Sequence, residues 1–137
     1  METFKEYIEK LDKLEFEKMY ENDFFLTWEK TRDELEAVFT VADTLRYLRE
    51  NNISTKIFDS GLGISLFRDN STRTRFSFAS ACNLLGLEVQ DLDEGKSQIS
   101  HGETVRETAN MISFMADIIG IRDDMYIGKG NAYMHEV

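Results

Sequence analysis

Between residues 61 and 122 the sequence alternates short strand-like runs with longer runs of helical period, and this order constrains the fold most. Strand-like runs stand at Ile64–Phe67, Leu87–Leu92 and Ile118–Ile121. The intervals between them hold one helix ending at about Leu85 and another from Gly102 to Met115. A strand–helix–strand–helix–strand order favours parallel pairing, because each helix returns the chain to the edge where the preceding strand began. The sequence therefore predicts an α/β fold with a parallel sheet.

Two further helices are expected ahead of this region. Apolar residues at helical spacing from Phe4 to Leu14 predict a helix over residues 3–20. Thr31 followed by Glu34 has the pattern of a capping box, so a second helix should start there and end at Asn51 or Asn52. The side chains expected to be buried are Leu35, Val38, Phe39, Ala42, Leu45 and Leu48 in that second helix, and Phe76, Ala79 and Cys82 in the helix that ends near Leu85.

The formal net charge of -10 opposes affinity for nucleic acid or for an anionic membrane, because both require positive charge on the facing surface. No apolar run approaches the 18 residues of a membrane span, and the N-terminus lacks the apolar core of a secretory signal. Cys82 has no second cysteine with which to form a disulfide. We expect a cytoplasmic protein without nucleic-acid or membrane partners, and an inert core thiol at Cys82.

The run Ser71-Thr72-Arg73-Thr74-Arg75 follows a predicted strand and opens a predicted helix. Ligands of parallel sheets bind beyond the carboxyl ends of the strands, and the first turn of a helix offers free backbone N–H groups to a phosphate. Cations are disfavoured in that turn by about 0.3–1 kcal/mol each. Two arginines and three hydroxyls there are explained if an anion completes the site.

The competing interpretation is that Ser71 or Thr72 is an ordinary N-cap and that the arginines are solvated or paired with acids. The residues by themselves leave the two interpretations level. Arg122 stands at the end of another predicted strand, so a parallel sheet would bring it to the same edge. The polar loop from Asp93 to Thr104 could close over a ligand, although its composition alone favours an ordinary surface loop.

Other chemistry is not indicated. The Gly61-Leu62-Gly63 run lacks a third glycine and precedes its strand, so it is not a dinucleotide fingerprint, and there is no lysine loop of the Walker type. The residues after Asp91 do not fit a calcium loop. His101, His135 and one cysteine do not make a zinc site. We predict no metal and no cofactor.

The stretch Phe67–Phe78, which contains Ser-Thr-Arg-Thr-Arg, resembles the signature of the aspartate and ornithine carbamoyltransferase family. Gly102-Glu103-Thr104, a helix and a strand ending in Arg122 follow at the spacing of that family. The resemblance covers roughly residues 31–122. It implies an α/β, three-layer domain with a central parallel sheet flanked by helices.

The resemblance also implies roles for individual residues. Ser71, Thr72, Arg73 and Thr74 would hold the phosphate of carbamoyl phosphate. Arg122 would contact the carbamoyl carbonyl and the phosphate, so that Arg73 and Arg122 are the candidate catalytic residues. The possible inter-subunit loop would contain Lys96, Ser97 and His101, with the histidine standing where the aspartate enzyme has a lysine.

On this reading residues 1–137 form a single carbamoyl-phosphate-binding domain with an extra N-terminal helix at about 1–20, and the second, amine-binding domain is absent. The complete protein would be a homotrimer, or a multiple of one, that transfers a carbamoyl group between phosphate and a small amine or amino acid. This chain alone would be inactive. Two alternatives stay open: a non-catalytic phosphate-binding regulatory domain, and a helix-rich interaction domain whose arginines are surface residues.

Overall fold

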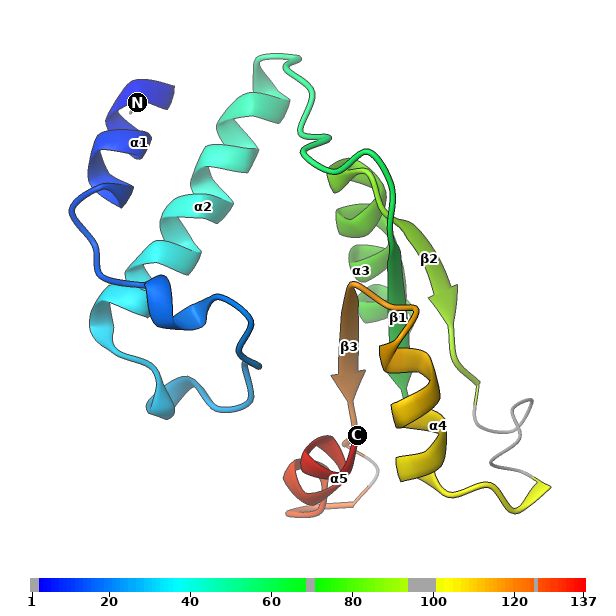
Figure 1. Cartoon of the computed structure of the whole chain (residues 1–137). Helices are drawn as coiled ribbons and strands as arrows, with labels where there is room; N and C mark the ends of the chain where they lie inside the picture. Colours follow the sequence, from blue (N-terminus) through cyan, green and yellow to red (C-terminus); the bar gives the residue numbers. More distant parts are fainter. Residues whose placement is uncertain (1–2, 69–70, 94–100, 125) are drawn as a thin grey trace. The chain divides into compact units, whose positions relative to one another are not determined.

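The computed structural model describes residues 3–68, 71–93, 101–124 and 126–137. It divides into two compact units, Met1–Thr55 and Lys56–Val137, which are treated separately below. The first unit holds α1 (Phe4–Leu11), α2 (Arg32–Glu50) and two short 3₁₀ helices, Glu17–Met19 and Thr27–Glu29. The second holds β1 (Leu62–Phe67), α3 (Thr72–Leu85), β2 (Glu88–Asp91), α4 (Val105–Ser113), β3 (Ile118–Arg122) and α5 (Gly130–Glu136) (Figure 1). No helix of the described residues has the length and hydrophobicity needed to cross a membrane.

The first unit is a packed pair of helices. Both α1 and α2 begin with a capping box, so the box predicted at Thr31 and Glu34 is confirmed. Tyr7 of α1 meets Tyr47 of α2 edge to face, with ring centroids 6.2 Å apart. An ion pair of 2.5 Å between Lys10 Nζ and Glu36 Oε1 adds a polar link at their contact. The pairing of two amphipathic helices therefore organises this unit.

The predicted helix over residues 3–20 is wrong in its length, because α1 ends at Leu11. The backbone N–H groups of Lys13 and Leu14 bond to carbonyls three residues back, which tightens the last turn. The N–H of Glu15 then donates to Asp33 Oδ2, 3.1 Å away in the first turn of α2. A carboxylate from another helix thus satisfies a backbone donor that a continuing helix would have used, and the chain turns there. Periodicity within one segment cannot reveal such a contact.

The buried face predicted for α2 is also wrong. Glu34, Ala37, Thr40 and Thr44 are buried, whereas Val38, Phe39 and Ala42 are exposed and the predicted leucines are half-buried. The threonine hydroxyls are satisfied within the helix: Thr40 Oγ1 donates to the carbonyl of Glu36, and Thr44 Oγ1 to that of Thr40, both at 2.7 Å. A hydroxyl bonded four residues back loses little on burial. A prediction based on apolar residues alone therefore does not identify this buried face, because threonines form part of it.

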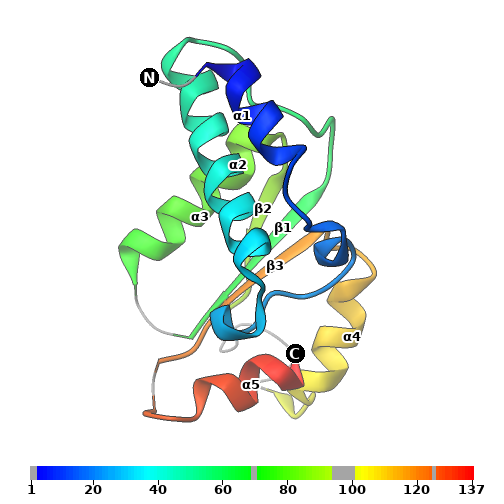
Figure 2. The same ribbon diagram turned by 90° about the vertical axis from the view of Figure 1, so that its left-hand side faces the viewer.

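The second unit contains the predicted parallel sheet, with strand order β2–β1–β3. Phe67, Phe78 and Gly120 lie together on one face of the sheet, where α3 packs. Leu66 points to the other face and lies with Ala109 and Ile112 of α4 and Tyr133 of α5. Figure 2 shows α3 on one side of the strands and α4 with α5 on the other. The predicted three-layer α/β fold is confirmed.

Glycines let α3 approach the sheet closely. A Cβ on Gly63 would lie 2.8 Å from Cys82 Sγ, and one on Gly120 would lie 2.6 Å from the ring of Phe78. Phe78 therefore occupies the inward position expected for Phe76, whose side chain is exposed, so that expectation was wrong. Cys82 is buried as predicted, and burial raises the pKa of its thiol. Gly86 ends α3 with φ of 102°, in the left-handed region that glycine tolerates.

Replacing Gly120→Ala should destabilise the protein by about 1–3 kcal/mol, because the added methyl overlaps the Phe78 ring. Urea unfolding measures this loss. In a Phe78→Leu background the same change should cost less, since the smaller side chain leaves room. An equal cost in both backgrounds would contradict the proposed clash.

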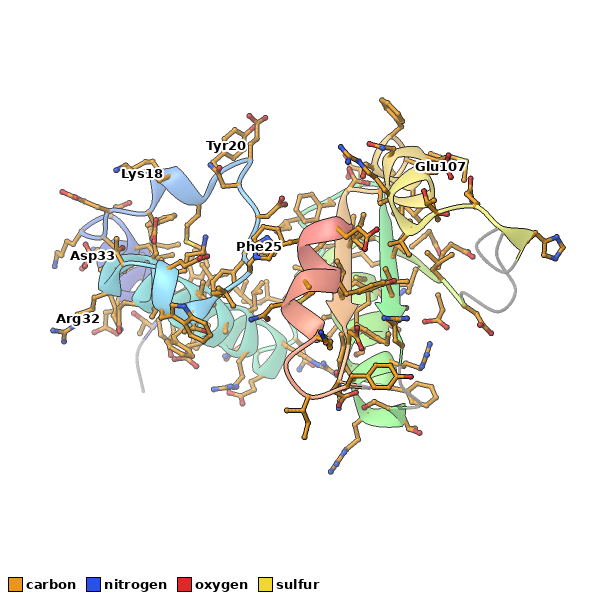
Figure 3. All side chains as sticks on the ribbon, turned by 90° about the horizontal axis from the view of Figure 1, so that it is seen from below. Lys18, Tyr20, Phe25, Arg32, Asp33 and Glu107 are labelled. Carbon is orange, nitrogen blue, oxygen red and sulfur yellow. The ribbon has the colours of Figure 1, made fainter. Side chains whose placement is uncertain are left out.

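The capping box at the start of α4 provides a prediction about pH. Glu107 stands in the first turn of α4 (Figure 3). The backbone N–H of Thr104, and then its hydroxyl, donate to the Glu107 carboxylate and hold its pKa below the ordinary value of 4.5. A lowered folded pKa stabilises the protein above the unfolded value, and this contribution is lost as the pH falls through the folded value. Titration by NMR should give a pKa below 4.5 for Glu107.

In Thr104→Val the Glu107 pKa should move back toward 4.5, because the hydroxyl donor is gone. Glu6 is the matched control, since Thr3 lowers its pKa in an independent capping box. A Glu107 pKa that does not respond to the Thr104 substitution would show that the Thr104 hydroxyl does not contribute to the lowered value.

Candidate anion-binding site

The site begins where β1 and β3 end. These strands pair in parallel with Phe67 opposite Arg122, and the backbone N–H of Arg68 donates to the Arg122 carbonyl at 3.0 Å. The chain leaves β1 toward Ser71, the N-cap residue of α3, while β3 ends at Arg122. The predicted arrival of Arg122 at the same edge as the Ser71–Arg75 run is confirmed.

Arg122 joins the two segments through its guanidinium. Its Nη1 donates to Ser71 Oγ at 2.7 Å and to Thr74 Oγ1 at 2.6 Å. The two hydroxyls share a further hydrogen bond of 2.8 Å. Nη2 of Arg122 donates to Asp124 Oδ2 at 2.7 Å, a partner that sequence reasoning missed. Asp124 follows the strand end by two residues. Its closeness to Arg122 in the sequence could have been used to predict this partner.

Ser71 does not act as a side-chain cap, although it occupies the N-cap position of α3. The threonines before α1, α2 and α4 each accept a backbone N–H, whereas the Ser71 hydroxyl faces Arg122 and Thr74 instead. The first turn of α3 also contains no acidic residue. The interpretation of Ser71 as an ordinary cap is therefore wrong, and the start of α3 keeps its positive character.

The two arginines of the first turn have different environments. Arg75 pairs with Asp91 at the end of β2, and its Nη2 donates to the carbonyl of Phe67 at 2.7 Å. Asp91 also accepts from Ser65 Oγ at 2.6 Å. Arg75 thus fastens α3 to the ends of two strands. Arg73 is exposed, and no ion pair joins it to any other residue that the structure describes.

Thr72 is exposed and faces a different part of the surface from Ser71 and Thr74. It lines an open depression of about 460 Å³ between α3 and β2, together with Arg75, Phe76 and Asp91 among others. Among the described residues, no hydrogen bond joins Thr72 to Arg122. The structure therefore brings Ser71, Thr74 and Arg122 together, and leaves Thr72 and Arg73 open on the first helical turn.

The loop predicted to enter a neighbouring site is described only in part. Lys96 and Ser97 lie outside the described residues, while His101 is exposed. Behind it, Glu103 Oε2 accepts from Thr108 Oγ1 at 2.7 Å, and Thr104 caps α4. The helix expected from Gly102 therefore starts three residues later, because Thr104 is its N-cap.

A family model with the description "Aspartate/ornithine carbamoyltransferase, carbamoyl-P binding domain" matches residues 22–136. The protein named "Putative carbamoyltransferase YgeW" in Escherichia coli K12 is 69% identical over 137 residues, which are all of this chain and 34% of the relative. An ornithine carbamoyltransferase of Prochlorococcus marinus is 34% identical over 100 residues, covering 73% of this chain and 31% of the relative. The chain thus spans about a third of the length of these curated relatives.

Solved structures agree on the fold. Trypanosoma cruzi aspartate transcarbamoylase in complex with carbamoyl phosphate matches with a TM-score of 0.75 at 20% identity, over 91% of this chain and 40% of that one. Another structure of that enzyme, with aspartate and phosphate, matches with a TM-score of 0.71 at 20% identity, over 78% and 35%. At such identity the likeness concerns the fold alone.

The contrasting environments of Arg73 and Arg75 lead to opposite predictions for stability. Arg75→Ala should destabilise the protein by about 1–3 kcal/mol, because Asp91 and the Phe67 carbonyl lose a charged donor. Arg73→Ala should leave stability unchanged or raise it by up to about 1 kcal/mol, because a cation leaves the positive end of α3. Urea unfolding of both variants tests this, and a clear loss in Arg73→Ala would show that Arg73 has a structural role.

Proposed function

This chain belongs to the aspartate/ornithine carbamoyltransferase family, and from that membership we propose that it forms the carbamoyl-phosphate half of an active site. In the complete protein, that site moves a carbamoyl group between carbamoyl phosphate and a small amine or amino acid. The observation that carries the proposal is the convergence of Arg122 on the Ser71 and Thr74 hydroxyls at the uncapped start of α3.

The hydroxyl pair and the first turn of α3 present groups that can bind an anion. Ser71 Oγ and Thr74 Oγ1 both accept from Arg122, and one of the two O–H groups donates to the other oxygen. In the proposal a hydroxyl of this pair rotates on anion binding and donates to a phosphate oxygen. Unbonded N–H groups of the first helical turn add further donors. In the proposal Arg73, exposed on the same turn, completes the phosphate site. Thr72, whose side chain lines the depression beside β2, contributes its backbone N–H.

The proposed reaction places negative charge in two positions. Attack of the amine nitrogen on the carbamoyl carbon raises the charge on the carbonyl oxygen, and cleavage of the C–O bond to phosphate leaves charge on the departing phosphate. Arg122 polarises the carbonyl, while Arg73 and the hydroxyls stabilise the phosphate. The proton that the attacking amine loses is transferred to the departing phosphate or to solvent. The chain's contribution is positioning and electrostatic stabilisation, and the same site serves the reverse phosphorolysis.

The remaining features of the proposal rest on family resemblance. They comprise a homotrimer, a cytoplasmic location, and a loop with Lys96, Ser97 and His101 that reaches a neighbouring subunit. The related enzymes are named for aspartate and for ornithine, and the acceptor of this protein is proposed only as a small amine or amino acid. A non-catalytic phosphate-binding domain is the second candidate, because the groups that converge at this edge of the sheet, Arg122 with the Ser71 and Thr74 hydroxyls, can bind an anion without catalysing a reaction.

The test is a calorimetric titration of the complete protein with carbamoyl phosphate, with inorganic phosphate as competitor. We expect saturable binding and, with a suitable amine, turnover. Arg73→Ala should weaken binding at least about tenfold, because a charged donor to the phosphate is lost. Binding without turnover across amines and amino acids would favour the non-catalytic domain.

Arg106→Ala provides the matched control. Arg106 is also an exposed arginine in a first helical turn, that of α4, so its loss changes net charge and helix electrostatics in the same way. It should leave carbamoyl phosphate affinity within about twofold of the unchanged protein. Equal losses in both variants would indicate a general charge effect and would refute the assigned phosphate site.

A further inference from the structure

A partly buried ion pair joins the residues that directly follow β1 and β3. Arg68 Nη1 lies 2.9 Å from Asp123 Oδ2, and the two side chains are 26% and 2% exposed. Family membership and the motif around Ser71 give this pair no role. Sequence reasoning missed it, although an arginine and an aspartate directly after two apolar strands were a usable signal.

Arg68 also contacts a third element. Its guanidinium carbon lies 4.2 Å from the centroid of the Tyr133 ring on α5, and Tyr133 is itself buried. The N-terminus of α5 packs against the same segment, since a Cβ on Gly130 would lie 2.3 Å from the carbonyl oxygen of Asp123. One side chain therefore connects the ends of both strands with the helix that follows.

The energetics suggest that this arrangement serves more than stability. A buried ion pair gains little over well-packed apolar residues of similar volume, because both charges lose their hydration. Removing Arg68 alone is costly, because the Asp123 carboxylate, which is 2% exposed, then stays buried without this cation. What the pair supplies, and an apolar contact does not, is a directional link between two particular atoms.

The position of that link matters for the anion site. Arg68 precedes Ser71 by three residues, and Asp123 is adjacent to Arg122. Hydrogen bonds of 2.7 and 2.6 Å from Arg122 to Ser71 and Thr74 are lost if the strand ends shift by about an ångström. The Arg68 N–H bond to the Arg122 carbonyl holds the backbones together, and the ion pair holds the side-chain end of the same junction.

We propose that Arg68 is a positioning residue, which through Asp123 and Tyr133 fixes Arg122 against the Ser71 and Thr74 hydroxyls. This inference rests on the proposed function in taking carbamoyl phosphate as the anion of the site. A misplacement of about 1 Å in such a site can cost about a hundredfold in rate. Weakening the link should therefore raise KM for carbamoyl phosphate and lower kcat even where the fold is intact.

The decisive variant of the complete protein replaces both charges, Arg68→Met with Asp123→Leu. Single replacements should lower the unfolding midpoint in urea, whereas the double variant should recover it, because no uncompensated charge stays buried. Its kcat/KM for carbamoyl phosphate should nevertheless stay at least about tenfold below that of the unchanged protein. Recovery of both stability and kcat/KM to within twofold would overturn the proposal and leave the pair a purely structural role.

A second variant covers the case in which the double replacement does not fold. Arg68→Lys keeps a positive charge beside Asp123 but loses the planar guanidinium that stacks on Tyr133. Because the Asp123 carboxylate keeps a cationic partner, this variant should lose less stability than Arg68→Met. Its affinity for inorganic phosphate should fall at least about fivefold, and an unchanged affinity would overturn the proposal. Phosphate also separates the two hypotheses: if the unchanged protein binds phosphate but never uses carbamoyl phosphate, the proposed function fails while phosphate affinity still reports on positioning. If it binds neither, both fail.

Discussion

Hydrogen bonds between β1 and β3 set Phe67 opposite Arg122, and the geometry of the anion site depends on that register. A parallel sheet brings the carboxyl ends of its strands to one edge, so residues about fifty positions apart in sequence become neighbours there. A one-residue slip would turn the Arg122 side chain to the opposite face, away from Ser71 and Thr74. The close packing of the Phe78 ring on Gly120 also favours this register, because only that alignment places the ring over a residue without a side chain.

The arginines around this edge have two kinds of role: some hold elements of the fold together, and others are placed to bind an anion. Arg75 has its donors taken by Asp91 and a backbone carbonyl, and Arg68 is held by Asp123 and Tyr133. Both fasten elements together. Arg122 bonds to hydroxyls that can themselves donate to an anion, while Arg73 extends from the first turn of α3. In an acidic chain, the local concentration of arginine at this edge supplies the positive charge that an anionic ligand requires.

The first unit shows where sequence reasoning failed. The end of α1 was placed too late because the Asp33 carboxylate, from another helix, takes the N–H of Glu15. The buried face of α2 was assigned to the wrong residues because threonines with internally bonded hydroxyls replace larger apolar side chains there. The first error concerns a contact that forms only after two segments have come together, and periodicity describes one element at a time. The second concerns threonines that can be buried because their hydroxyls bond within the helix, which a count of apolar residues does not include.

The sequence by itself determined the order of strands and helices, the parallel sheet, and the segments Ser71–Arg75 and Arg122 as parts of one edge. It could do so because apolar period and turn residues are local, and because parallel connection follows from their order. Only the tertiary structure decided which arginines pair with acidic residues and which are exposed, and in particular that Arg68 pairs with Asp123. It also decided that the Ser71 side chain does not cap α3. Those outcomes depend on which side chains meet across elements, and distances between atoms far apart in the chain are set by packing rather than by any local pattern.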